Sequence, residues 1–163
     1  MIVQHVLVPL DFSATADQAL AYAIAFTIPL QARLTLLHVL HIPPLTLEEG
    51  AIAMSGTYLE DLETEAHHLL QASLAQVQRA GLQGDCLLVQ GTPTQAIVDT
   101  AGAQGVDLII MGTHGRTGVS HVLLGSVAEH VVRAAPCPVL VTRETRDGSG
   151  ILATSAGPPP AQP

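Results

Sequence analysis

The sequence of 163 residues contains no lysine, so its six basic side chains are all arginines. This absence excludes three kinds of site that depend on a lysine amine. They are the Walker A loop of P-loop nucleotidases, the phosphate-binding lysine of protein kinases and the Schiff-base lysine of cofactor enzymes. A phosphate site in this chain must therefore rely on arginine or on main-chain N–H groups.

Aromatic residues are also scarce, with two tyrosines, two phenylalanines and no tryptophan. The core must therefore be aliphatic, and few rings are present to stack on single-stranded nucleic acid or on a flavin. Fourteen acidic residues against six arginines give a formal net charge of −8. An acidic chain without a basic stripe is a poor match for nucleic acid or for an anionic membrane, so neither is expected as a partner.

Only two cysteines are present, Cys86 and Cys137, and they form no CxxC pair. This favours reduced, buried thiols over metal ligands. Long hydrophobic runs are missing as well, because the longest, residues 20–30, is too short to cross a bilayer. The N-terminus has no basic segment of the kind that opens a secretory signal. We therefore expect a cytoplasmic protein.

Histidine is comparatively frequent, with eight copies. HxxH at the end of a strand has poor geometry for sharing a metal, and neighbouring helical positions do not face each other. No cysteine lies beside the histidines that we considered, and we expect surface or cleft positions for them: His38, His41, His67, His68, His114, His121 and His130.

The sequence does contain a regular alternation of strand and helix patterns. Runs of Val, Ile and Leu predict strands at residues 2–9, 33–40, 85–89, 108–111 and 137–142. Apolar periodicity predicts helices at 14–28, 58–80 and 94–103, and a fourth beyond residue 118 whose pattern Gly125-Ser126 interrupts. This alternation predicts a single α/β domain with a doubly wound, Rossmann-like parallel sheet of five strands and helices on both faces.

Several residues predict where elements begin and end. Ser13 is a good N-cap for the first helix, and Pro93 suits the first turn of the third. Pro138 predicts that the fifth strand lies at an edge, because proline cannot donate to a ladder. The domain should cover residues 1–146. The Gly/Ser/Pro-rich tail at 147–163 has little to bury, so we expect it to be disordered.

The loop after the fourth strand has the composition of an anion site. Three glycines occur within residues 112–118, and Gly125-Ser126 follows near a helix. Glycines let a ligand approach the backbone, and a helix N-terminus offers N–H groups and a favourable dipole to negative charge. The alternative is that these glycines only make a tight turn between strand and helix. The dinucleotide fingerprint GxGxxG does not fit, since Gly112 and Gly115 are two residues apart.

The spacing Gly112-x2-Gly115-x9-Gly125-Ser126 resembles the ATP-binding signature of the universal stress protein family. The similarity extends over residues 2–143 and includes PLDFS, LLHVL, GVDLIIMGTHG, LLGSVAEHVV and PCPVLV. It implies the strand order 3-2-1-4-5, with the reversal between strands one and four. Cys86 and Cys137 would then lie roughly 19 Å apart, at about 4.8 Å per strand, which forbids a disulfide. The resemblance also implies a homodimer that forms through the fifth strand.

The resemblance further implies a set of nucleotide-binding residues. Pro9 and Asp11 would flank adenine and ribose, and the backbone of Val39 would bind adenine. Met111 and Gly112 would border the nucleoside, and the phosphates would lie among Gly115, Arg116, Gly125, Ser126 and Val127. As a residue type, the Asp11 carboxylate suits ribose hydroxyls or a share in holding Mg²⁺ or Mn²⁺ near the phosphates. It could instead cap the first helix, and Arg116 could simply be a solvated loop residue.

These residues predict an ATP-binding regulatory module of a stress response, with little or slow hydrolysis. The alternative is a genuine ATPase or phosphotransferase that uses Asp11 or His114 as its base. Phosphoryl transfer needs a positioned base and strong charge stabilisation in the transition state. One loop arginine and no lysine supply little of that stabilisation. A binding module is therefore the favoured interpretation, and a flavin module lacks the rings to hold its cofactor.

Overall fold

The computed structural model describes residues 2–41, 56–113, 124–142 and 151–155. Strands and helices alternate along the chain, as the periodicity predicts. The elements are β1 (His5–Pro9), α1 (Ala14–Thr27), the 3-10 turn η1 (Ile28–Leu30), β2 (Arg33–Leu40), α2 (Gly56–Arg79), β3 (Gly84–Gln90), α3 (Pro93–Ala103), β4 (Leu108–Gly112), α4 (Ser126–Ala134), β5 (Val139–Thr142) and β6 (Ile151–Ser155).

The first five strands form a parallel sheet in the order β3-β2-β1-β4-β5, which confirms the expected topology. Successive side chains of a strand point to opposite faces. In β1, Val6 and Val8 accordingly pack on one side of the sheet and Leu7 on the other. All three are fully buried, so helices must cover both faces.

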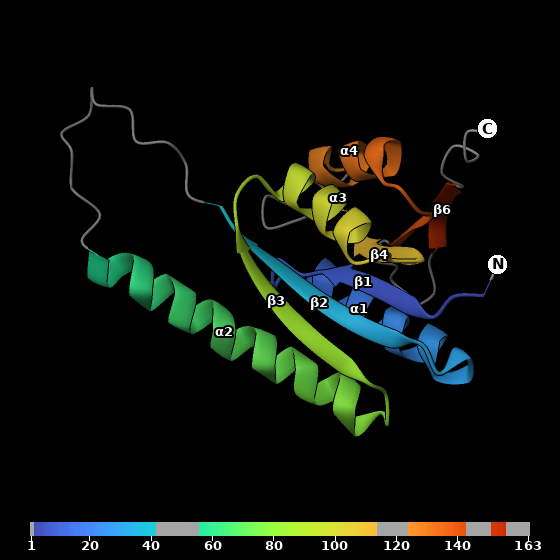
Figure 1. Ribbon diagram of the computed structural model, residues 1–163, viewed down its shortest axis with the longest axis horizontal. Coiled ribbons are helices and arrows are strands. Elements are labelled where there is room, and N and C mark those ends of the chain that lie inside the picture. The colour runs from blue at the N-terminus through green and yellow to red at the C-terminus, as the bar shows by residue number, and fades with distance from the viewer. Residues whose placement is uncertain (1, 42–55, 114–123, 143–150, 156–163) are drawn as a thin grey trace.

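Helices α1 and α2 lie on one face of the sheet, and α3 and α4 lie on the other (Figure 1). Helices α1 and α2 bury one face through an aliphatic cluster that includes Leu20 and Leu70. Helices α3 and α4 bury the other through a cluster that includes Ile97 and Val131. No aromatic ring is needed in the fully buried core, in agreement with the composition.

Local capping sets several of the helix ends. The Ser13 side chain accepts a hydrogen bond from the Ala16 N–H and so caps α1, and Pro93 occupies the first turn of α3. Both predictions are confirmed. On the inner side of α2, Ala66, Leu70, Leu74 and Val77 are buried, and three leucines are half-buried. The half-buried ones, Leu59, Leu62 and Leu69, lie in its N-terminal two-thirds, where the first turns of the helix reach past the strands (Figure 1).

The tail corrects two predictions. Residues 151–155 form β6, which pairs antiparallel with β5, so the sheet has six strands and this part of the tail is ordered. Residues 147–150 and 156–163 lie outside the described chain. The edge position predicted from Pro138 is wrong, because β5 lies between β4 and β6. Pro138 precedes the strand, so it costs the ladder no donor.

Both cysteines are free, and the strand order separates them as expected. Cys137 is buried, whereas Cys86 is only half-buried in β3, so the prediction of a buried thiol holds for one of the two. Burial raises the pKa of the Cys137 thiol to about 11. Within the described residues, no helix is long and apolar enough to cross a membrane.

Candidate functional site

The candidate site lies where the carboxyl ends of β1 and β4 meet. These strands are neighbours, with Val6 opposite Leu108 and Leu7 opposite Ile109. From β1 the chain continues to β2 and β3 on one side of this point, and from β4 it continues to β5 on the other side. Ligands of doubly wound sheets bind at such a reversal, outside the carboxyl ends of the strands. Pro9 and Gly112, the last residues of the two strands, therefore lie at the expected end of the sheet.

The N-terminus of α4 is fixed directly beyond β4. The Thr113 N–H donates to the Thr142 carbonyl at 2.8 Å, and the Gly125 N–H donates to the Thr113 carbonyl at 2.8 Å. Two short main-chain bonds thus connect β5, the end of β4 and the start of the helix. A helix leaves its first N–H groups without partners inside the helix. Here these groups belong to Ser126, Val127 and Ala128, and they begin at the switch point.

The start of α4 differs from the helix expected around Gly125-Ser126. Gly125 has φ −60° and ψ 150°, which is extended backbone, and the helix begins at Ser126. Gly125 is therefore the residue before the helix and does not interrupt one. The first intrahelical bond runs from the Glu129 N–H to the Gly125 carbonyl. This correction moves Gly125 and Ser126 to the one part of a helix that attracts anions.

Gly112 is glycine for a reason that the sequence does not reveal. A Cβ at this position would lie 2.9 Å from the carbonyl oxygen of Thr15 and 3.1 Å from its carbonyl carbon. The first turn of α1 therefore packs directly against the end of β4. The missing side chain is explained by this packing, so an open approach for a ligand is not required to account for it.

Asp11 is held in a compact turn between β1 and α1. Its Oδ1 accepts from the Ser13 N–H at 3.1 Å and from the Ser13 hydroxyl at 2.6 Å. The same hydroxyl is the cap of α1, so Asp11 supports the capping residue through Ser13. The capping role that was weighed for Asp11 is thus present in this indirect form. The Asp11 side chain is half-buried, two residues after the end of β1.

The remaining predicted residues fall into two groups. Pro9, Val39 and Val127 are half-buried at this end of the sheet, and Ser126 is exposed. Met111 is only 5% exposed and packs in the core between the sheet and α3–α4, so its main chain is the part near the site. Gly115, Arg116 and His114 lie outside the described residues, and their roles stay predictions.

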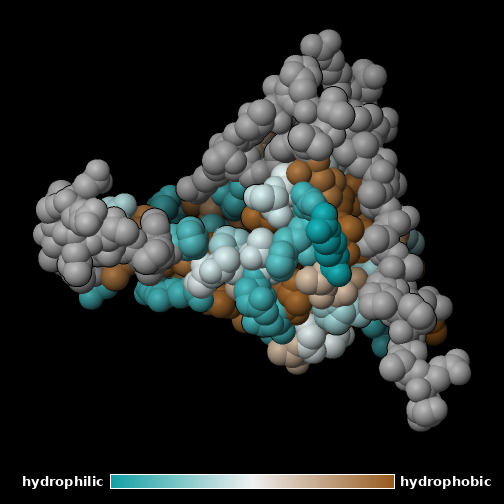
Figure 2. Space-filling model, turned by 90° about the horizontal axis from the view of Figure 1, so that it is seen from above, coloured by the Kyte–Doolittle hydropathy of each residue, from teal (hydrophilic) through white to brown (hydrophobic). Residues whose placement is uncertain are grey.

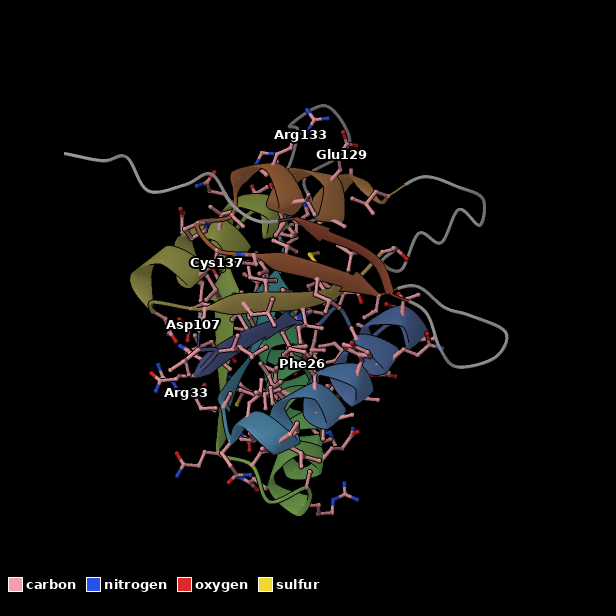
Figure 3. All side chains as sticks on the ribbon, turned by 90° about the vertical axis from the view of Figure 1, so that its right-hand side faces the viewer. Phe26, Arg33, Asp107, Glu129, Arg133 and Cys137 are labelled. Carbon is pink, nitrogen blue, oxygen red and sulfur yellow. The ribbon has the colours of Figure 1, made fainter. Side chains whose placement is uncertain are left out.

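The described surface on the side of α3 and α4 is largely polar (Figure 2). Figure 2 views the molecule from the side of α3 and α4 and shows hydrophilic residues across this face with apolar ones between them. On α4, Arg133 pairs with Glu129 one turn away. Both side chains are exposed and extend outward from the helix, away from the sheet (Figure 3). Among the described residues, no group of three or more His, Cys, Asp or Glu side chains could hold a metal ion.

Three residues near the site carry contacts that the sequence analysis missed. Thr113 connects β4 to both β5 and α4. Phe12 adopts φ 61°, in the left-handed region that bulky residues rarely enter. His38, expected only at a surface or cleft position, contacts Phe12 and the Leu10 carbonyl. Of the three, only Thr113 could have been found from the sequence, because it directly follows Gly112 at the end of a predicted strand.

The chain matches the model of one protein family, described as the universal stress protein family, over residues 3–143. Universal stress protein MJ0577 of Methanocaldococcus jannaschii is 33% identical over 153 residues, which cover 86% of this chain and 94% of that relative. The solved structure of MJ0577 superimposes with a TM-score of 0.77 and covers 90% of this chain and 99% of that one. Universal stress protein UspA of Lactobacillus plantarum gives a TM-score of 0.72 at 29% identity, covering 86% and 98%.

Two further structures share the fold at lower identity. A universal stress protein in complex with cAMP has a TM-score of 0.67 at 22% identity, covering 88% of this chain and 98% of that one. A family protein of Arabidopsis thaliana with AMP bound has a TM-score of 0.61 at 18% identity, covering 88% and 94%. These ligands are those of the two proteins named.

Proposed function

The chain belongs to the universal stress protein family, and from this membership we propose that it binds an adenine nucleotide, ATP above all, and acts as a nucleotide-dependent regulatory protein in a stress response. Hydrolysis would be slow or absent. The observation that carries the proposal is the position of the α4 N-terminus, tied by the Gly125–Thr113 bond to the switch point between β1 and β4.

The chemistry at this point suits a polyphosphate better than a neutral ligand. The N–H groups of Ser126, Val127 and Ala128 start α4, and a helix N-terminus carries roughly half a positive charge. Ser126 adds an exposed hydroxyl. Such an arrangement can bind phosphate without lysine, which the sequence does not contain. Gly115 and Arg116 would complete the phosphate site, and ATP would bring Mg²⁺ or Mn²⁺ with it, with Asp11 as the candidate protein ligand.

The nucleoside would lie over the ends of β1 and β2. Pro9 and Val39 are half-buried there, and Asp11 follows within two residues of Pro9. A carboxylate at this position can accept hydrogen bonds from ribose hydroxyls. Two proteins of the same fold were solved with AMP and with cAMP, which supports an adenine nucleotide as the ligand class.

We further propose the homodimer through β5 that the resemblance implies. Such a dimer requires the outer edge of β5 to be accessible. Strand β6 already pairs with β5 on the side away from β4. A partner strand could take this edge only if β6 left it. A cytoplasmic location stays a prediction.

The test is to purify the full-length protein without added nucleotide and to identify what co-elutes by mass spectrometry. Phosphate release is then measured with ATP and Mg²⁺ or Mn²⁺. Bound adenine nucleotide that persists for hours supports the regulatory function. Sustained release of many phosphates per protein each minute would favour the ATPase alternative with Asp11 or His114. No nucleotide in the eluate and no binding of added ATP would contradict the proposal altogether.

A further inference from the structure

The turn that carries Asp11 contains a strained residue. Phe12 has φ 61°, and a large side chain in this region of backbone space costs free energy that neighbouring contacts must offset. Phe12 lies between Asp11 and Ser13, within the turn in which Asp11 Oδ1 accepts from both the N–H and the hydroxyl of Ser13. The orientation of the carboxylate thus depends on a backbone conformation that Phe12 alone would not prefer.

His38 holds this turn from the neighbouring strand. Its Nδ1 lies 2.6 Å from the Leu10 carbonyl oxygen, which can only accept, so Nδ1 carries the hydrogen. Its ring also lies against the Phe12 ring, with centroids 4.5 Å apart and planes tilted by 32°. The β1–β2 register runs as far as Pro9 and Leu37, and the Leu10 N–H still donates to Leu37. The two contacts of His38 begin where that register ends.

We propose that His38 is a positioning residue for nucleotide binding. It fixes Leu10 and Phe12, one on either side of Asp11, and thereby keeps the Asp11 carboxylate in the orientation that receives the ribose of an adenine nucleotide. This inference rests on the proposed function. His38 acts through the turn and is not assigned a contact with the nucleotide.

A comparison of three substitutions tests the hydrogen bond directly. The Nδ2 of an asparagine lies close to the place of a histidine Nδ1, whereas the amide of a glutamine reaches further, toward the place of Nε2. We expect His38→Ala to weaken ATP binding about fivefold to tenfold, the scale of one well-made hydrogen bond. His38→Asn should recover most of the affinity, and His38→Gln should not. Dissociation constants are measured by titration calorimetry on the full-length chain with ATP and Mg²⁺.

Two controls separate positioning from general destabilisation. Val77→Ala removes a methyl pair from a fully buried side chain on α2, so it should lower the melting temperature and leave ATP affinity unchanged. In a double-mutant cycle, His38→Ala should have almost no further effect once Asp11→Ala is present, because both changes remove the same interaction. The affinity for 2′,3′-dideoxy-ATP, which lacks the ribose hydroxyls, should be equal in the wild type and in His38→Ala.

Four outcomes would overturn the inference while the proposed function stands. They are an unchanged ATP affinity in His38→Ala, equal affinities for the Asn and Gln variants, additive effects of His38→Ala and Asp11→Ala, and an equal loss for dideoxy-ATP. If the variants fail to fold, the wild-type Nδ1–H resonance of His38 can be followed by NMR in histidine-labelled protein. We expect it to shift on saturation with ATP, and an unchanged resonance would contradict the role. A wild type that binds no adenine nucleotide would instead refute the proposed function.

Discussion

The first turn of α1 leaves no room for a side chain on Gly112, since a Cβ there would lie 2.9 Å from a backbone oxygen of Thr15. We therefore expect Gly112→Ala to lower the free energy of unfolding by about 1–3 kcal/mol, the usual cost of overpacking. Gly102→Ala is the matched control. Its Cβ would meet nothing closer than 4.0 Å, in the exposed side of α3, so it should raise stability by about 0.5–1 kcal/mol.

Urea denaturation of the two variants measures both changes in the free energy of unfolding. If Gly112→Ala were as stable as the wild type, the turn of α1 would have to move, and packing would not explain the glycine. The sequence predicted that Gly112 lies at the candidate site, but it did not predict why position 112 must be a glycine. Its cause is a contact between residues nearly a hundred positions apart, and no local pattern records that contact.

His5, at the opposite end of the sheet, should make stability depend on pH. Burial lowers its pKa below the ordinary 6.5, and the neighbouring Arg33 lowers it further, against smaller opposing effects of the Gln104 main chain, Asp85 and Asp107. Its Nδ1 lies 3.0 Å from the Arg33 guanidinium, which can only donate, and its Nε2 lies 2.8 Å from the Thr35 hydroxyl. Figure 3 shows Arg33 and Asp107 at this end of the strands, away from Glu129 and Arg133 of α4.

The sign follows from the lowered pKa. The unfolded chain binds the His5 proton more readily than the folded chain, so this stabilisation is complete above about pH 6.5 and is lost as the pH falls toward the folded pKa. We expect His5→Gln to be less stable than the wild type at pH 7.5, with a smaller difference at pH 5.5. Urea midpoints at both pH values check this. An equal difference at the two values would contradict a buried neutral imidazole.

Among the elements, α4 shows both how far the sequence pattern reaches and where it stops. Helical periodicity located the helix, but it did not show that Gly125 precedes it, because a glycine inside a helix and a glycine before one leave the same apolar spacing. The strand order, the faces of the helices and the caps at Ser13 and Pro93 could be predicted, since each depends on short-range patterns or on the family resemblance.

The start of α4 offers a change that should move stability and affinity in opposite directions. Aspartate at position 126 places a negative charge in the first turn, where the helix dipole favours it by about 0.3–1 kcal/mol. The same charge would repel a polyphosphate. We expect Ser126→Asp to melt at a higher temperature than the wild type and to bind ATP at least tenfold more weakly. Ser126→Ala, as the uncharged control, should weaken binding only slightly.

Thermal melts and calorimetry on the same samples provide the two readings. If Ser126→Asp bound ATP as well as Ser126→Ala does, the phosphates would not lie at the N-terminus of α4. This outcome would leave the fold untouched and would move the phosphate site to another part of the switch point.

At the scale of the whole molecule, the tail changes the edge of the sheet. Composition predicted disorder for residues 147–163, yet 151–155 pair with β5. The composition of a segment indicates how much apolar surface the segment itself can bury. It does not show whether the edge of a sheet formed by other residues can hydrogen-bond to the main chain of that segment. The five parallel strands that the alternation predicted are present, in the order that the family resemblance implied. The sixth strand lies beyond residues 3–143, which the family model matches.

Removal of the tail should therefore promote association. A chain that ends at Arg143 would expose the N–H and C=O groups of β5, and unpaired edges recruit strands from other molecules. We expect this chain to form more dimer than the full-length protein at equal concentration, by sedimentation or light scattering. Ala153→Pro, which keeps the full length but weakens pairing, should fall between the two. Equal dimer fractions in all three would show that β6 does not control the edge.

We propose that main-chain N–H groups at the start of α4 bind the polyphosphate of an adenine nucleotide in a chain without lysine. The most direct test of this proposal is calorimetric titration of ATP with Mg²⁺ into the nucleotide-free wild type and into Gly125→Val. Valine can adopt the φ of −60° found at Gly125, so the variant should keep its fold. We expect saturable binding at one site in the wild type and at least a tenfold loss of affinity in a folded Gly125→Val. Wild-type affinity in that variant would contradict a phosphate site at the start of α4.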